Sequence, residues 1–150
     1  MYHTIIQRKL RSVFEEINTG NYQPVLDGMA PKFDHRFSGA HALGGRRTSR
    51  EAYRRWFERF VRIFPHLQFE IRNIVVSGWP WNTIAAVEWL DRIQADDGNQ
   101  YENTGVHIIR LKWAKVAEIR IYCDTQKLAA VCEVQARCGR EDALASPITD

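Results

Sequence analysis

The segment from Trp81 to Asp124 constrains the fold more than any other part of this sequence. It contains three consecutive stretches in which apolar and polar residues alternate, the period-two pattern of β-strands with one buried face. Residues 96–99, Asp-Asp-Gly-Asn, tolerate a left-handed backbone and predict a hairpin between the first two stretches. A shorter turn near Ala114 and Lys115 precedes the third stretch. The pattern therefore predicts an antiparallel meander.

One phase of each predicted strand carries polar groups where a pure core would carry none. In this phase the first strand carries Trp89 and Asp91, and the second carries Tyr101, Asn103 and His107. The third strand carries Tyr122 and Asp124. If the three phases face the same way, Asp91, His107 and Asp124 form the polar floor of an apolar pocket. A carboxylate that is desolvated in such a pocket has a raised pKa and can exchange protons near neutral pH.

Length and composition limit the class of protein. A chain of 150 residues predicts one domain that is large enough to bury its own core. A hydrophobic content of 45% excludes a disordered chain. The net charge of +3 is a mild imbalance without the dense basic footprint of a nucleic-acid-binding protein. We therefore expect a globular protein that does not bind nucleic acid.

The cysteines, the histidines and the N-terminus bear on cofactors and location. Cys123, Cys132 and Cys138 form no Cys-x-x-Cys pair, which favours reduced thiols in a cytoplasmic protein. The histidines have no spacing that recruits zinc, so we expect neither a metal nor an organic cofactor. The residues near Met1 do not resemble a signal peptide, and no apolar run approaches the length of a membrane span. We expect a soluble protein with no membrane partner.

The first 47 residues predict two helices, a strand and a loop. Residues 3–19 carry apolar side chains at three-to-four spacing and predict a helix that Gly20 ends; a shorter helix runs from Asn21 to Leu26, before Pro31. Lys32–Ser38 alternates, with His35 on the face that carries two phenylalanines. His35 is therefore either a hydrogen-bonded core residue or part of the polar floor. Residues 39–47 contain three glycines and predict a loop.

A long helix and a bent strand lead into the meander. Thr48 or Ser49 caps a helix that runs through Phe64 and is ended by Pro65; Trp56 and Phe60 belong to its broad apolar arc. Leu67–Ser77 alternates with a phase shift at Asn73, which predicts a β-bulge. Residues 126–131 can form a last helical turn or two. We expect residues 1–131 to form the domain and 132–150 a peripheral tail, flexible or packed on a partner subunit.

At this point the chain resembles the SnoaL-like branch of the nuclear transport factor 2-like (NTF2-like) superfamily, over about residues 5–131. The motifs that carry the resemblance are Ser49-Arg50-Glu51-Ala52, Phe64-Pro65, Val87-Glu88-Trp89, Asp97 to Asn103, Ile109-Arg110-Leu111 and Ile121 to Asp124. The resemblance implies an α+β cystatin-like cone, in which a strongly bent antiparallel sheet wraps around a long helix with N-terminal helices. It also implies a pocket between sheet and helix, and a homodimer through the outer sheet face.

Proteins of this superfamily isomerise, dehydrate, cyclise, open epoxides or only bind. Asp91 and Asp124 fall where the epoxide hydrolases carry two pocket aspartates, but Trp89 stands where those enzymes have an arginine, which disfavours epoxide opening. The ketosteroid isomerase pattern needs a tyrosine on the first helix, and this chain has Phe14. The dehydratase pattern needs a His-Asp pair, which His35 or His107 could form with either aspartate.

Three hypotheses follow. The first is a pocket protein that acts on a small, largely apolar carbonyl or hydroxyl compound by acid–base chemistry without a cofactor. Its catalytic candidates are Asp91, Asp124, His107 and His35, and its substrate-binding candidates are Tyr101, Asn103, Tyr122, Trp89, Trp56 and Phe60. The second is a non-catalytic ligand-binding or dimerisation module, in which every polar group of the pocket has a protein partner and Asp124 caps a helix at Thr125. The third is an adaptor that binds another protein or an anionic surface through the arginine-rich helix, with Arg46, Arg47 and Arg50 at the contact.

Overall fold

A curved six-stranded sheet in the order β2-β1-β6-β5-β4-β3 is the frame of the computed structural model, which describes residues 1–150. The strands are β1 (Met29–Phe37), β2 (Gly45–Arg47), β3 (Leu67–Trp79), β4 (Asn82–Gln94), β5 (Gln100–Lys112) and β6 (Lys115–Cys123). The strands from β3 to β6 form the predicted antiparallel meander. Strand β1 pairs with β2 antiparallel but with β6 parallel, so one strand pair departs from the antiparallel expectation. The sheet is not closed.

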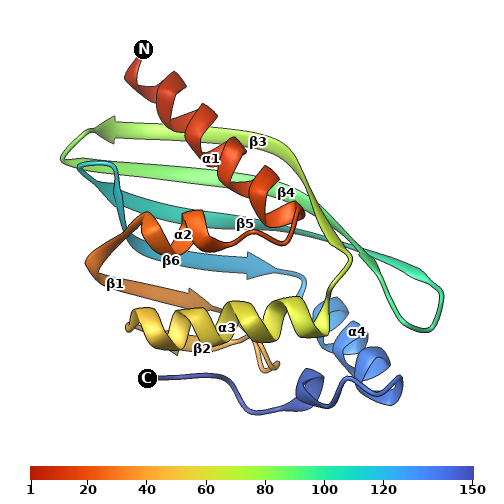
Figure 1. Ribbon diagram of the computed structural model, residues 1–150. Helices are drawn as coiled ribbons and strands as arrows, with labels where there is room; N and C mark the ends of the chain where they lie inside the picture. Colours follow the sequence, from red (N-terminus) through yellow and green to blue (C-terminus); the bar gives the residue numbers. More distant parts are fainter.

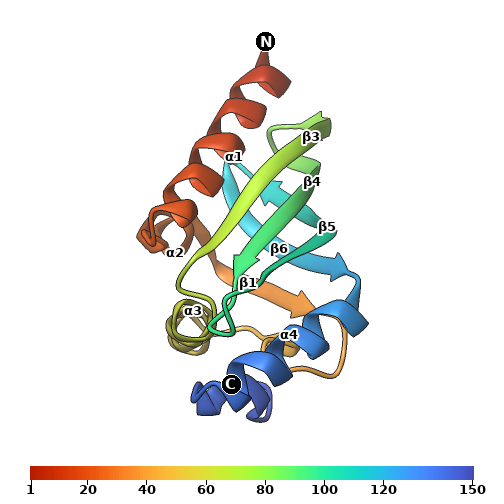
Figure 2. The same cartoon turned by 90° about the vertical axis from the view of Figure 1, so that its right-hand side faces the viewer.

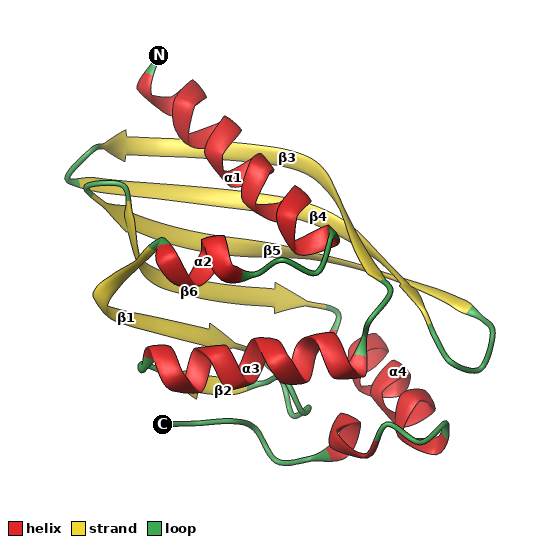
Figure 3. Ribbon diagram, in the orientation of Figure 1, coloured by secondary structure: helices red, strands yellow, loops and turns green.

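Three helices cover the concave face of this sheet. They are α1 (Tyr2–Asn18), α2 (Gln23–Asp27) and α3 (Arg50–Ile63); the helix α4 (Thr125–Arg137) and the 3-10 helix η1 (Glu141–Leu144) follow the sheet. Figures 1 and 2 show α1 and α3 on the same side of the strands, with α4 beyond the end of β6. Figure 3 shows the segregation of helices from strands. The predicted α+β cone is confirmed. None of the helices is both long and apolar enough to cross a membrane.

The structure confirms the sequence signals that bend the sheet and start the long helix. The pairing of β3 with β4 shifts register between Ile71 and Asn73, where the sequence pattern changes phase. Ser49 caps α3, because its side chain accepts a hydrogen bond from the Ala52 backbone N–H. The apolar arc of α3, including Trp56 and Phe60, is buried against the sheet. The hydrophobic core therefore lies between α3 and the concave face.

Two expectations for residues 29–47 were wrong. Strand β1 begins at Met29 and contains Pro31, which was expected to lie before the strand. Its pairing with β6 is irregular between Met29 and Asp34, so the missing N–H of Pro31 falls where the ladder is already interrupted. Residues 45–47, expected to be loop, form the short strand β2, in which Arg47 pairs with His35.

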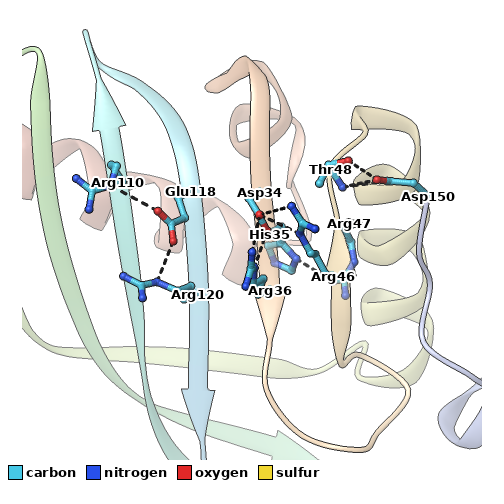
Figure 4. A network of polar contacts seen from close by, with 10 residues as sticks. All are labelled: Asp34, His35, Arg36, Arg46, Arg47, Thr48, Arg110, Glu118, Arg120 and Asp150. Atoms are coloured by element: carbon cyan, nitrogen blue, oxygen red, sulfur yellow. Dashed lines mark hydrogen bonds and ion pairs between the residues drawn. The ribbon is translucent and has the colours of Figure 1, made fainter.

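The C-terminal segment is more ordered than its composition indicates. Helix α4 continues to Arg137 because Leu128, Val131, Cys132 and Gln135 form a buried stripe. The last residues lie along the start of α3 in the same chain, where the Asp150 carboxylate accepts hydrogen bonds from the backbone N–H groups of Thr48 and Ser49, both at 2.9 Å. Figure 4 shows Asp150 beside Thr48. Residues 132–150 therefore pack on their own chain.

Candidate functional site

A cavity of about 110 Å³ lies between the concave sheet face and the three helices that cover it. Its wall is mostly apolar and includes Trp56 and Phe60 of α3 and Trp89 of β4. Four polar side chains that the sequence singled out also line it, namely His35, Asp91, Asn103 and His107. They come from β1, β4 and β5, so side chains from distant parts of the sequence meet in one cavity.

Asp91 is the acidic group of this cavity. Asp91 is 5% exposed, and its Oδ1 atom has no hydrogen-bond partner within the protein. It forms no ion pair with a basic side chain. Desolvation raises the pKa of the Asp91 carboxyl to about 7, and the backbone N–H of Asn103 only partly opposes this shift. Near neutral pH the site therefore holds a carboxyl group that can both take up and release a proton.

His107 presents a neutral imidazole. The Trp89 indole N–H donates a hydrogen bond of 2.8 Å to its Nδ1 atom. Because an indole nitrogen only donates, Nδ1 is unprotonated and the ring proton is on Nε2. Burial lowers the pKa of His107 to about 3, and the ring of Phe14 packs edge-on against it with centroids 5.1 Å apart. His107 is therefore a hydrogen-bond donor through Nε2 at neutral pH.

His35 is held in the same tautomer by a different donor. The Arg47 guanidinium donates a hydrogen bond of 2.8 Å to His35 Nδ1, as Figure 4 shows, and a guanidinium cannot accept one. The proton of His35 is therefore on Nε2, which is buried and has no partner within the protein. Burial and the Arg47 charge together lower the pKa of His35. The cavity thus contains two neutral histidines, each with an Nε2–H group.

Three of the remaining predicted residues line the cavity wall and have no free hydrogen-bonding group: two have already made their hydrogen bonds, and the third is a phenylalanine. The Trp56 indole donates to the Leu43 carbonyl oxygen at 2.8 Å. The Asn103 side chain donates to the Asp124 carbonyl oxygen at 3.0 Å and accepts from the Thr104 backbone N–H. Phe60 stacks on Trp56 with centroids 5.5 Å apart. These side chains shape the cavity, and the groups that can still form hydrogen bonds belong to Asp91, His107 and His35.

The structure places the other three candidates outside the cavity. Asp124 caps α4, where its side chain accepts a hydrogen bond from the Lys127 backbone N–H. Tyr122 is 45% exposed on the outer sheet face, because it alternates with residues of β6 that point inward. The Tyr101 hydroxyl donates to the Asp97 carboxylate at 2.6 Å, beside the β4–β5 turn. The alternative for Asp124, a helix cap, is the geometry that the structure has.

We expect Asp124→Ala to lower the free energy of unfolding by about 1 kcal/mol, because it removes the capping oxygen of α4. Asp124→Asn keeps a capping oxygen and should cost less. Urea denaturation measures both losses. Neither change should move the pKa of Asp91, followed by carbon NMR of its carboxyl group, since Asp124 does not contribute to that pKa. A shift of the Asp91 titration in Asp124→Asn would show that the two carboxylates interact.

Three residues that contribute to the cavity were not sequence candidates. Arg47 was assigned to the basic helix start, yet its side chain is fully buried behind His35. Cys123 lines the cavity, and burial raises the pKa of its thiol to about 12, so it stays protonated. Gly105 lies opposite Trp89 in the β4–β5 ladder. Arg47 follows the glycine pair of residues 44–45 by two positions, and nothing in this local sequence indicates that its side chain is buried. Its burial could be predicted only from the pairing of residues 45–47 with β1.

Gly105 gives the Trp89 ring the space to reach His107. A Cβ atom on Gly105 would lie 2.6 Å from two ring carbons of Trp89 and 2.5 Å from the Tyr122 carbonyl oxygen. Gly105→Ala should displace the indole, weaken its hydrogen bond to His107 and lower the free energy of unfolding by about 1–3 kcal/mol. Urea denaturation measures this loss. Thr104→Ala, at the exposed neighbour, is the control and should stay within about 0.5 kcal/mol of the wild type.

The arginines at the start of α3 do not form the basic surface that the adaptor hypothesis requires. Arg46 pairs with Asp34 at 2.8 Å on the outer sheet face, Arg47 is buried, and Arg50 donates to the Leu26 and Met29 carbonyl oxygens. Figure 4 shows Arg46 and Arg47 pointing to different partners. Asp150 already occupies the N-terminus of α3. These contacts disfavour an anionic partner at this place.

Solved structures with the same fold come from bacteria and a fungus. An NTF2-like protein of unknown function from Burkholderia pseudomallei aligns with a TM-score of 0.72 and 18% identity, over 83% of this chain and 95% of that one. PrhC from Penicillium brasilianum aligns with a TM-score of 0.76 and 15% identity, over 95% and 94% of the two chains. IdmH, a putative polyketide cyclase from Streptomyces antibioticus, aligns with a TM-score of 0.68 and 17% identity, over 85% and 98%. At these identities the likeness concerns the fold alone.

Family comparison gives a more direct result. No curated protein matches the chain significantly. The model of the SnoaL-like domain matches residues 10–119, which include α2, α3, the strands from β1 to β5 and both cavity histidines. Because this match covers well over half of the chain, and the fold agrees with it, the protein belongs to the SnoaL-like family of NTF2-like proteins.

Proposed function

We propose that the protein binds a small, largely apolar carbonyl or hydroxyl compound in its cavity and rearranges it by acid–base chemistry of the isomerase, dehydratase or cyclase type. The observation that carries this proposal is the Asp91 carboxyl. It is buried among apolar side chains, its Oδ1 atom has no partner, and its pKa is raised to about 7. Such a group is divided between its acid and base forms near neutral pH, which suits proton transfer to and from carbon.

The proposed reaction assigns a separate task to each polar group. The Asp91 carboxylate takes a proton from the carbon beside the substrate carbonyl; the electrons of that C–H bond form a carbon–carbon double bond, and the π electrons of the carbonyl group move to its oxygen. The Nε2–H of His107 or His35 donates a hydrogen bond to this oxygen and stabilises the enolate. Return of the proton from Asp91 to another carbon completes an isomerisation. The rings of Trp56, Phe60 and Trp89 hold the apolar body of the substrate.

The alternative is the non-catalytic ligand-binding or dimerisation module. It predicts a cavity in which each polar group has a protein partner. Asn103 and Trp56 meet that description, but Asp91 Oδ1 and His35 Nε2 do not. An unpartnered buried polar group costs about 1–3 kcal/mol of stability, which argues that these atoms face a ligand. The name of IdmH, a putative polyketide cyclase, is consistent with the cyclase type of chemistry.

Deuterium uptake tests the proposal without knowledge of the natural substrate. The probe is a β,γ-unsaturated cyclic ketone, incubated with the protein in heavy water, with mass spectrometry of the recovered ketone. We expect deuterium beside the carbonyl and a conjugated product with the wild type, and neither with Asp91→Asn. If a panel of such ketones raises the melting temperature of the wild type without deuterium uptake, the cavity only binds, and the alternative holds.

We also propose the homodimer that the family resemblance implies, through the outer sheet face. On that face Val75 and Ile84 are 55% and 38% exposed. Further along it, Asp34 and Glu118 each bridge two arginines, as Figure 4 shows. Sedimentation equilibrium of the wild type and of Ile84→Glu tests this assembly. A monomeric wild type at micromolar concentration would rule it out.

A further inference from the structure

Three tryptophans are exposed together at one end of the sheet. Trp79, Trp81 and Trp113 are 65%, 56% and 70% exposed, and they define the tryptophan cluster. Trp79 stacks on Trp81 with ring centroids 6.0 Å apart, and the ring centroids of Trp81 and Trp113 are 6.3 Å apart. Trp79 is the last residue of β3, Trp81 lies in the β3–β4 turn and Trp113 lies in the β5–β6 turn. Figure 1 shows these two turns side by side at the left end of the sheet. Contiguous exposed aromatic rings of this size mark an interaction surface.

The turns that carry the cluster are tied to each other and to α1. The Trp113 backbone N–H donates to the Pro80 carbonyl oxygen at 2.7 Å. His3 Nε2 lies 2.8 Å from the Gly78 carbonyl oxygen, and the Tyr2 and Thr83 hydroxyl groups form a hydrogen bond. These contacts fix the cluster in place, so its rings are presented by a defined surface.

The surroundings of the cluster are basic. The three segments that meet at this end, residues 1–14, 73–87 and 104–117, contain no aspartate or glutamate. Their lysines and arginines are Arg8, Lys9, Arg11, Arg110, Lys112 and Lys115. Glu118 offsets the charge of Arg110, because it pairs with Arg110 and Arg120, and Asp27 accepts from the Gln23 side chain. The five other basic residues form no ion pair with an acidic side chain. The cluster therefore lies in a positive field.

The cavity opens beside the tryptophan cluster. Lys9 and Ala114 are both exposed, and both line the cavity. Lys9 Nζ donates to the Ala114 carbonyl oxygen at 3.1 Å. Ala114 follows Trp113 directly in the β5–β6 turn. A surface that covers the cluster would therefore face the entrance of an apolar cavity.

We propose that the tryptophan cluster docks on the surface of an anionic lipid bilayer and sets the cavity entrance against it. Tryptophan is suited to this position because its ring is apolar while its N–H needs a polar partner, and it concentrates at membrane–water interfaces. Each lysine or arginine near an anionic membrane adds about 1 kcal/mol of attraction. The contact is peripheral, and the sequence-based expectation of no membrane partner considered only spanning segments. Docking does not depend on the proposed catalysis.

A second copy of the chain fits this surface less well. In a two-fold symmetric contact the same patch meets itself, so Lys112 and Lys115 of each copy would approach the basic residues of the other. That juxtaposition of like charges opposes association. An anionic surface neutralises the same residues.

Co-sedimentation with lipid vesicles tests the proposal. We expect the wild type to bind vesicles of phosphatidylcholine with phosphatidylglycerol, with a blue shift of its tryptophan fluorescence, and to bind pure phosphatidylcholine at least tenfold more weakly. Binding should weaken as salt is added. The combined variant Trp79→Ser, Trp81→Ser and Trp113→Asn should lose at least tenfold in affinity; asparagine is chosen because Trp113 has a φ of 52°. Leu144→Ser, which removes an exposed apolar residue of η1, should bind like the wild type.

Two results would overturn the proposal. One is equal, weak binding of the wild type to both kinds of vesicle. The other is a wild-type dimer by sedimentation equilibrium that the combined variant converts to a monomer, which would assign the cluster to a second copy. Quenching of wild-type fluorescence by brominated lipids gives a readout that needs no variant. Deuterium uptake from a soluble ketone should be unchanged in the combined variant, so failure of docking and failure of the proposed catalysis are distinguished.

Discussion

Asp91→Asn is expected to reduce deuterium uptake by about 10²–10⁴-fold, the usual contribution of a general base. The amide keeps the shape of the carboxyl group but cannot take a proton from carbon. Asp91 makes no ion pair and its Oδ1 has no partner, and asparagine keeps an oxygen that can accept from the Asn103 backbone N–H, so the substitution removes no hydrogen bond within the protein. Loss of activity should therefore occur in a protein that is at least as stable as the wild type. In the wild type, uptake should rise with pH through about 7, as Asp91 ionises.

The pH dependence of stability gives an independent check on Asp91. Its pKa is about 7 in the folded protein against 3.8 for a free side chain, so between these values the folded state binds more protons. The free energy of unfolding therefore falls as pH rises from about 4 to 7, by about 4 kcal/mol from this group. Asp91→Asn removes that loss. The two neutral histidines act with the opposite sign, since unfolding lets them bind protons below pH 6.5.

The difference in free energy of unfolding between the wild type and Asp91→Asn separates the contribution of Asp91 from that of the two histidines. Urea denaturation at a series of pH values should show the advantage of Asp91→Asn growing from pH 4 to 7 and then remaining constant. Asp124→Asn is the matched control, since Asp124 is a partly solvated helix cap. A difference that does not change with pH would mean that Asp91 keeps an ordinary pKa, and the proposed general base would then lack its physical basis.

The sequence predicted the fold, and seven of its ten candidate site residues line the cavity, because the phase of a strand and the apolar arc of a helix are local patterns. Asp91 and His107 belong to β4 and β5, which pair without interruption from Thr83 to Gln94, so residues of one phase share a face along the whole pair. The phase of Trp89 and the apolar arc of α3 could be read in the same way. These parts follow from alternation and spacing within single elements.

The placement of Asp124 and Tyr122 depended on a β-bulge with no sequence signal. In the hairpin between β5 and β6, Leu111 pairs with Val116 but Arg110 pairs with Glu118, so Ala117 is an additional residue. One extra residue reverses the faces of the rest of the strand. Without it, Tyr122 and Asp124 would lie in the same phase as His107, as the sequence analysis assumed. With it, Ile121 and Cys123 face the cavity instead.

The partner of His35 could not be predicted for a different reason. His35 contacts Arg47 because residues 45–47, at the end of a glycine-rich loop, pair with β1. The Ile148 carbonyl oxygen reaches Arg47 because the C-terminal segment returns to α3. Both contacts join parts of the chain that no local pattern relates. The alternatives for His35, core residue or site residue, are not exclusive in the structure. It is fully buried and hydrogen-bonded at Nδ1, and its Nε2–H still has no partner within the protein.

Arg47→Met is expected to lower the free energy of unfolding by about 2–4 kcal/mol and to release the tautomer of His35. The Arg47 guanidinium is fully buried and donates to three acceptors: the Gly44 and Ile148 carbonyl oxygens and His35 Nδ1. Each orphaned acceptor costs about 1–3 kcal/mol. The loss is partly offset because methionine brings no charge to desolvate, and burial already lowers the pKa of Arg47 to about 10.

The specific readout is nitrogen NMR of the His35 ring. In the wild type we expect only the tautomer with the proton on Nε2, because Arg47 can only donate to Nδ1. In Arg47→Met the proton should distribute between both ring nitrogens, and the pKa of His35 should rise because the neighbouring positive charge is gone. Arg46→Met is the matched control: Arg46 is exposed, points to the outer face and pairs with Asp34 at 2.8 Å.

Loss of that exposed pair should cost about 1 kcal/mol or less and leave the His35 spectrum unchanged. If Arg47→Met is destabilised while His35 keeps a single Nε2 tautomer, Arg47 is structural and some other contact sets the histidine. If the tautomers mix and deuterium uptake falls together with them, Arg47 is a positioning residue for the proposed reaction. In that case the C-terminal segment also serves the site, because the Ile148 carbonyl oxygen accepts a hydrogen bond from the Arg47 side chain.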